Sequence, residues 1–172
     1  MLPLSLSLNL RPVEENSHMS GNVISHKSMN SIPVNLIAPC GMNCRLCWGF
    51  IREKNTCPGC KSIETPGTKK SAYRDTCKIK NCASLKSGKA GYCSDKCGSF
   101  PCARLKQLDK RYKTKYKMSM IENLKMINDS GVRYFIRNEK LKWACPECGK
   151  SLCVHKPECT FCGYKWNVET AP

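Results

Sequence analysis

Residues 145–163 read CPECGKSLCVHKPECTFCG, and the two cysteine doublets in this stretch decide how it folds. Cys145 and Cys148 form the first doublet, Cys159 and Cys162 form the second, and a glycine follows each. Paired cysteines at this spacing are typical of zinc ribbons, in which two tight turns each offer two thiolates to one ion. Glycine permits the positive φ that aims backbone N–H groups at the sulfur atoms. We therefore predict a structural zinc site here.

The residues within and just after this stretch lead to a strand prediction and to two interpretations of one pair of residues. Residues 150–154 and 164–168 alternate as short strands do, so we predict them as the strands of the ribbon. Cys153 and His155 lie between the doublets and have two interpretations. They are either a strand residue and an exposed imidazole, or a second metal contact or reactive thiol beside a histidine.

Ten further cysteines between residues 40 and 102 predict more metal sites. Two sets of four suit tetrahedral zinc, which brings the expected total to about three zinc ions. The first set is Cys44, Cys47, Cys57 and Cys60; the second is Cys77, Cys82, Cys93 and Cys97; Cys40 and Cys102 could replace a member of either. Because tetrahedral sulfur sites also suit iron–sulfur clusters, a cluster is the alternative cofactor in this region.

The triplet in CGMNCRLC, residues 40–47, has the Cys-x3-Cys-x2-Cys spacing of radical S-adenosylmethionine enzymes. Such an enzyme needs a long run of alternating strands and helices after the triplet, whereas much of the chain after Cys47 is further cysteine turns. Leu46 also stands where those enzymes usually have an aromatic residue. Ser/His/Asp, paired-carboxylate and phosphate-loop patterns are absent from the sequence, so hydrolysis and group transfer have little support. The sequence favours a non-catalytic protein.

Composition and charge limit the class of protein and its partners. Fifteen cysteines are an odd number, so disulfides cannot pair them all within one chain. The apolar opening is too short to cross a bilayer and lacks the features of an export signal, so we expect a cytoplasmic protein without a membrane partner. The formal charge of +16 falls to about +10 once three Zn(Cys)4 sites are counted. Nucleic acid or an acidic protein is the expected partner class, and the oligomeric state stays open.

We predict a small, metal-stabilised α+β protein in four parts. These are a disordered extension over 1–35, a cysteine-rich zinc-knuckle module over 36–102, a short basic helical segment over 103–143 and a zinc-ribbon-like segment over 144–168.

The helical segment is predicted from apolar spacing and a start signal. Ser119 followed by Glu122 matches a capping box, and an apolar stripe continues from it until Gly131 ends the helix. An earlier helix is expected around Leu105, where apolar residues recur at helical spacing. Residues 132–143 fit either a helix or a strand, and a helix is favoured for the first half.

Basic residues crowd the stretch 104–117, interleaved with Tyr112 and Tyr116. Cations contact phosphates and tyrosines can stack on bases, so this stretch is a candidate nucleic-acid surface; the alternative is an ordinary solvated helix face. The candidate contact residues are Arg104, Lys106, Lys110, Arg111, Lys113, Lys115 and Lys117. A second function class is redox or metal handling by iron–sulfur or labile thiols, for which the triplet and the unpaired Cys40, Cys102 and Cys153 are the distinguishing features.

Four stretches taken together resemble a known family. IAPCGMNCRLC, TCPGC, CKIKNCASLKSGKAGYCSDKCGSFPCARLKQLDKRY and CPECGKSLCVHKPECTFCG are similar to the cysteine-rich prokaryotic family called domain of unknown function 3795. The resemblance runs from about Leu36 to Gly163 and implies zinc binding, without an established activity or substrate. It also implies that Cys153 and His155 belong to a recurrent Cys-Val-His element.

Overall fold

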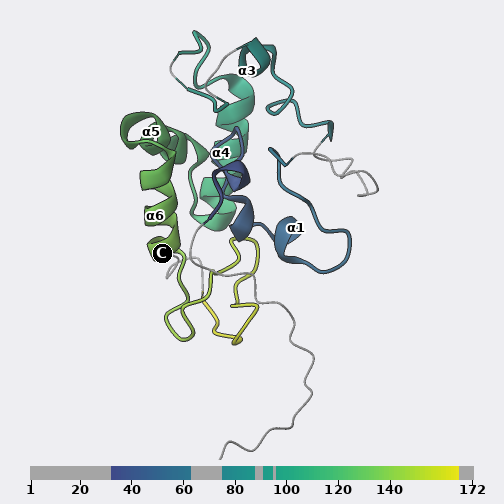
Figure 1. Ribbon diagram of the computed structural model, residues 1–172, viewed down its shortest axis with the longest axis vertical. Coiled ribbons are helices and arrows are strands. Elements are labelled where there is room, and N and C mark those ends of the chain that lie inside the picture. Colours follow the sequence, from purple (N-terminus) through teal and green to yellow (C-terminus); the bar gives the residue numbers. More distant parts are fainter. Residues whose placement is uncertain (1–31, 63–74, 88–90, 95, 167–172) are drawn as a thin grey trace, which may run out of the picture.

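The computed structural model describes residues 32–62, 75–87, 91–94 and 96–166, and these form a small, partly helical protein (Figure 1). The helical part of the predicted fold class is confirmed. In chain order the described elements are η1 (Val34–Leu36), η2 (Cys44–Leu46), α1 (Trp48–Ile51), α3 (Ala83–Ser87), α4 (Ala103–Tyr116), α5 (Met120–Ser130) and α6 (Val132–Lys142).

Helix α4 lies at the centre of the molecule. Helix α5 packs against both α4 and α6, while α1 lies on the opposite side of α4 in Figure 1. Leu105 is buried on the packed face of α4, and Lys117 ends the helix in the left-handed conformation with a φ of 51°. The C-terminal cysteine segment, drawn in yellow-green and yellow, lies at one end of these helices.

The start of α5 follows the predicted cap. The hydroxyl oxygen of Ser119 accepts the N–H of Glu122 at 3.1 Å, which satisfies one of the free donors of the first turn. Ser119 in turn donates its hydroxyl hydrogen to Oδ1 of buried Asp109 at 2.7 Å, so α4 fixes the cap of α5. The predicted stop is confirmed as well, because α5 ends at Gly131 with a φ of 85°.

The ambiguous segment after Gly131 is helical throughout as α6. Phe135, Ile136 and Glu139 are its buried residues, and their spacing places them on one helical face. Packing against α5 and η1 resolves the ambiguity, since a strand would turn alternate residues away from that core.

Core side chains join the helices to the C-terminal segment. Trp143 follows α6 and packs edge-to-face on Trp166, with ring centroids 5.9 Å apart. Leu152 and Val154 are also buried, with 2% and 1% of their surface exposed. Val154 donates its N–H to the carbonyl of Leu46 at 2.9 Å, which ties the segment to η2.

The predicted β part of the fold is wrong for the described residues, which contain isolated bridges and no sheet. The bridges in the C-terminal segment pair Ala144 with Ser151 and Glu158 with Lys165. A strand over 150–154 does not form because its backbone bonds go to separate partners: Leu152 N–H to Trp143, and Val154 N–H to Leu46. No continuous ladder can grow from such divided bonding.

Parts of the predicted domain scheme lie outside the described residues. These parts are residues 1–31 of the extension, 63–74, 88–90 and 95 of the cysteine-rich module, and 167–168 of the second predicted strand. Residues 32–35 of the predicted extension are described, and there Ile32 is buried and η1 begins at Val34. No helix in the described part of the chain has the length and apolar run needed to cross a bilayer.

Candidate metal centre and the cysteine-lined cavity

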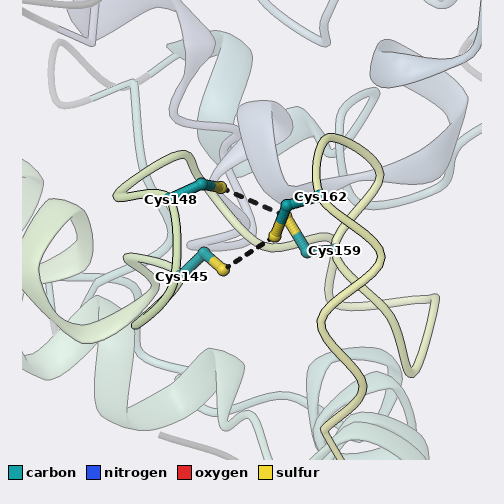
Figure 2. Close-up of side chains that lie close together, drawn as sticks. All are labelled: Cys145, Cys148, Cys159 and Cys162. Atoms are coloured by element: carbon teal, nitrogen blue, oxygen red, sulfur yellow. Dashed lines mark hydrogen bonds between the residues drawn. The ribbon is translucent and has the colours of Figure 1, made fainter.

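Four cysteine sulfur atoms converge in the C-terminal segment. The Sγ atoms of Cys145, Cys148, Cys159 and Cys162 all lie within 4.8 Å of one another, with 3.6 Å between Cys145 and Cys162 and 3.7 Å between Cys148 and Cys159. Figure 2 shows the four side chains turned toward one another, two from each turn. This set could hold a metal ion.

The two turns that supply these sulfurs are built alike. The N–H of Gly149 bonds the carbonyl of Cys145 at 2.8 Å, and the N–H of Gly163 bonds the carbonyl of Cys159 at 2.9 Å. Both glycines have positive φ, 67° and 75°, a conformation that other residues rarely adopt. The positive φ predicted for both glycines is therefore confirmed.

Backbone amides and neighbouring thiols shift the pKa values of Cys145 and Cys162. Desolvation alone would raise the pKa of the Cys145 thiol, but the amides of Cys148 and Glu147 bond its sulfur and lower the pKa to about 7. At Cys162 the Tyr164 amide lowers the pKa, yet desolvation and the neighbouring thiols outweigh it and raise the pKa to about 12. Four thiolates this close repel one another, so full ionisation requires a cation among them.

The donor set and spacing fit zinc. A tetrahedral ion with Zn–S bonds of about 2.3 Å separates its sulfur ligands by roughly 3.8 Å. The two sulfur–sulfur distances of 3.6 and 3.7 Å are close to that value. Cys145 and Cys159 are buried at 2% exposure each, while Cys148 and Cys162 lie toward solvent, so an ion would sit at the edge of the core.

Comparisons with protein-family models, curated proteins and solved structures give no match for this chain.

The ten cysteines between residues 40 and 102 are arranged differently. Outside the C-terminal set, no group of three metal-ligating side chains in the described part of the chain comes within 4.8 Å of one another. Six of the ten instead line one cavity of about 890 Å³ between the cysteine-rich segment and α4. These six are Cys40, Cys44, Cys47, Cys57, Cys60 and Cys77.

Close thiol pairs occur within the cavity wall. The thiol of Cys44 hydrogen-bonds that of Cys60, and this bond together with burial raises the pKa of Cys44. Burial raises the pKa of Cys40 to about 12, with Cys60, Cys77 and Cys93 near enough to add to the effect. The wall thus mixes members of both predicted sets, and the division between the sets stays a prediction.

The remaining four of the ten cysteines, Cys82, Cys93, Cys97 and Cys102, do not line the cavity. Burial raises the pKa of Cys93 to about 11, and each of the other three thiols adds to this shift, with Cys102 making the largest contribution of the three. This neighbourhood is compatible with a second site that includes Cys102, and its ligand set stays a prediction.

The structure shows how far Cys153 and His155 are buried and what the imidazole contacts. Cys153 is fully buried and is not among the four clustered sulfurs. The imidazole is not exposed, as one interpretation expected, but half-buried, and it packs edge-to-face on Tyr112 and Tyr116 with centroids 5.6 and 4.8 Å away. Its Nδ1 accepts the N–H of Trp48 at 3.3 Å. Burial lowers the pKa of His155, which keeps the ring neutral.

The basic residues of α4 do not form one surface. Arg104, Arg111 and Lys115 line the cavity, whereas Lys113 pairs with Glu122 at 3.1 Å and lies 3.7 Å from Asp109. The three other predicted contact residues, Lys106, Lys110 and Lys117, are exposed and are not part of the cavity wall.

Sequence reasoning did not find the cavity. The signal was present in α4, where residues 104, 108, 111, 112 and 115 recur at helical spacing and form one stripe that faces the cysteines. The opposite wall comes from residues 38–60 and 76–79 and could not be matched to this stripe before the chain was folded.

Proposed function

We propose that this protein is a zinc-binding protein whose C-terminal four-cysteine site is structural. The carrying observation is the convergence of Cys145, Cys148, Cys159 and Cys162 at sulfur–sulfur distances that suit one tetrahedral ion. Four thiolates leave no open coordination position for a substrate or water, so the ion would stabilise the fold rather than catalyse.

The surroundings of this site support a structural role. Cys145 directly follows Ala144 and buried Trp143, and Trp166 follows the second turn and packs on Trp143. An ion that joins the two turns would hold both tryptophans against the helices. Because no backbone hydrogen bond among the described residues joins 143–152 to 157–166, metal binding would supply much of the free energy that holds the two turns together.

We further propose a non-catalytic binding module within the family of domain of unknown function 3795, with zinc at two more sites in 40–102. The exposed Lys106, Lys110 and Lys117 are candidates for contacts with nucleic acid or an acidic protein. Stacking on bases has less support, because Tyr112 and Tyr116 pack on each other and on His155. A triple Lys→Glu variant at those three lysines would abolish salt-dependent binding to a single-stranded oligonucleotide if the partner is nucleic acid.

A second candidate is an iron–sulfur or thiol-based redox protein. The observation that favours it is the cavity with six cysteines in its wall, in which no three thiols come as close as a single tetrahedral ion requires. An iron–sulfur cluster needs more widely spaced thiolates than one zinc ion and a cavity to contain it.

Elemental analysis of protein purified without oxygen, together with an absorption spectrum, tests both proposals. The zinc proposal expects about three zinc ions per chain and no visible colour, with one ion lost in a Cys145→Ser, Cys162→Ser variant. Stoichiometric iron with acid-labile sulfide and visible absorption would replace it with the redox proposal for 40–102. Absence of any metal from both regions would overturn the zinc and iron–sulfur proposals and leave redox chemistry of the free thiols.

A further inference from the structure

The cavity has one wall of thiols and a facing wall of cations. Helix α4 turns Arg104, Arg111 and Lys115 toward it, and Lys78 lines it from the preceding segment. No Asp or Glu occurs among the described residues of the wall. Within the described part of the chain, no carboxylate forms an ion pair with Arg104, Arg111 or Lys115. A concave surface with several convergent cations and no acid to neutralise them attracts anions.

The hydrogen bonds of His155 add one more donor to this wall. The N–H of Trp48 donates to Nδ1, so the proton of the neutral ring is on Nε2. Nε2 lies 3.0 Å from the hydroxyl oxygen of Tyr112 and donates to it. The tyrosine hydroxyl is therefore an acceptor in this bond, and its own hydrogen is available to a ligand in the cavity that Tyr112 lines.

The two arginines of α4 also suit an oxyanion by their geometry. Arginine side chains offer two parallel N–H groups that match the two oxygens of a phosphate or carboxylate, whereas lysine acts as a point charge. Arg104 and Arg111 are two helical turns apart on the same face, with Leu108 between them. An oxyanion between the arginines could be contacted from both ends.

From these observations we infer that the cavity is a binding site for a small oxyanion, a phosphate ester or a carboxylate, held by Arg104, Arg111, Lys115 and the hydroxyl of Tyr112. A single-stranded nucleic acid fits less well, because the aromatic rings at the site pack on one another and the surface is concave. The inference goes beyond the C-terminal zinc site and does not depend on it; it requires that any metal bound in 40–102 leave the cavity open beside α4.

Titration calorimetry of the full chain at low ionic strength tests the inference, with inorganic phosphate, glycerol 3-phosphate and succinate as probes. Metal content is measured on each sample, and samples of equal metal content are compared, because metal-bound thiolates would change the charge of the opposite wall. We expect saturable binding of at least one probe to one site. Tighter binding of glycerol 3-phosphate than of succinate would assign a phosphate ester, and the reverse order a carboxylate.

Two double variants that remove the same charge, one inside the cavity and one outside it, show whether binding depends on the cavity. Arg104→Gln with Arg111→Gln removes two cavity cations and should weaken binding at least tenfold, since each loses a charge-assisted bond. Lys125→Gln with Arg133→Gln removes the same charge from exposed positions on α5 and α6, outside the cavity, and should change binding less than twofold. Tyr112→Phe should weaken it several-fold. If the arginine double variant fails to fold, Lys115→Gln replaces it, with Lys125→Gln as the control.

Two results would overturn the inference. The first is that none of the three probes binds the wild-type chain at millimolar concentration. The second is equal weakening by the cavity and control variants, which would mean attraction by overall charge. Binding of a single-stranded RNA oligonucleotide without binding of any of the three small anions would belong to the first result.

Discussion

The Nε2 atom of His155 lies 3.0 Å from the hydroxyl oxygen of Tyr112, and this contact joins the C-terminal segment to α4. The other ring nitrogen of His155 accepts the backbone N–H of Trp48, so the imidazole bridges three segments of the chain. The tyrosine also lines the cavity. One side chain of the Cys-Val-His element therefore connects the candidate zinc segment to the cation-lined wall.

Replacement of Tyr112 by Phe measures this connection. The variant keeps the ring packing and removes the hydroxyl that accepts from His155, so the free energy of unfolding should fall by about 1 kcal/mol. Urea denaturation of the metal-loaded protein gives the value. Tyr116→Phe is the matched control, because within the described residues the Tyr116 hydroxyl makes no hydrogen bond while its ring packs on the same imidazole. Equal losses in the two variants would show that the bond contributes nothing.

Replacement of Cys162 by Ser should remove one zinc ion per chain. A hydroxyl is a poor substitute for a thiolate, and metal binding free energy is folding free energy at such a site, so the free energy of unfolding should fall by at least about 3 kcal/mol. Elemental analysis and thermal melting report both effects. Thr160→Ser, between the two cysteines of the same turn, should keep the ion. Full zinc content in the Cys162→Ser variant would contradict a four-thiolate site.

Glu139 predicts an unusual pH dependence. Burial raises the pKa of this carboxyl from 4.5 to about 7, against opposing contributions from Lys142, Asn43 and Trp143. The folded chain therefore binds more protons than the unfolded chain between about pH 4.5 and 7, and this group lowers the stability as the pH rises through that range. Glu139→Gln should thus be more stable than the wild type at pH 8, by up to roughly 3 kcal/mol.

The measurement compares urea midpoints of wild type and variant at several pH values from 5.5 to 8. The stability difference should shrink toward the acidic end, because the carboxyl of the folded chain is protonated there. It should disappear only below the unfolded pKa of 4.5, where the carboxyl is protonated in both states. Glu53→Gln is the control, since it makes the same substitution at an exposed position. A difference that is constant across the range would rule out titration of Glu139 as the cause.

Gly41 should tolerate alanine less well than Gly131, although both have a φ of 85°. A Cβ at Gly41 would lie 2.9 Å from Cγ of Leu124 and 2.9 Å from the carbonyl oxygen of Met120, whereas a Cβ at Gly131 would meet nothing within 4 Å. Gly131→Ala should cost about 1–3 kcal/mol through backbone strain alone. Gly41→Ala should cost more by at least about 1 kcal/mol because α5 must shift. Thermal melting of the two variants under one condition checks the order, and the reverse order would refute the packing of Gly41 against α5.

Asp109 should be the most important carboxylate for the junction of α4 and α5. Its Oδ1 accepts the hydroxyl hydrogen of Ser119 at 2.7 Å and the N–H of Ile121 at 3.0 Å. Asp109→Ala leaves these donors without their acceptor in a buried place and should lower the free energy of unfolding by roughly 2 kcal/mol. Asp129→Ala, on the exposed end of α5, should change it by less than about 0.5 kcal/mol. Comparable losses would mean that Asp109 acts only through overall charge.

Features that depend on a few neighbouring residues were predictable from the sequence. The two Cys-x2-Cys-Gly turns carry their geometry locally, because the turn, the positive φ of glycine and the bonds to sulfur all arise within six residues. The same holds for the cap of α5, in which Ser119 and Glu122 are three residues apart. The four clustered sulfurs followed from two such turns and a short connection.

Only the tertiary structure decided which distant residues meet. Residues 150–154 alternate like a strand, yet their hydrogen bonds go to Trp143 and Leu46 and no sheet forms in the described residues. The burial of Glu139, the His155–Tyr112 contact and the division of the α4 cations between cavity and solvent depend on segments brought together by the core. Spacing along the chain encodes the face on which a side chain lies, but what lies opposite that face is set by packing.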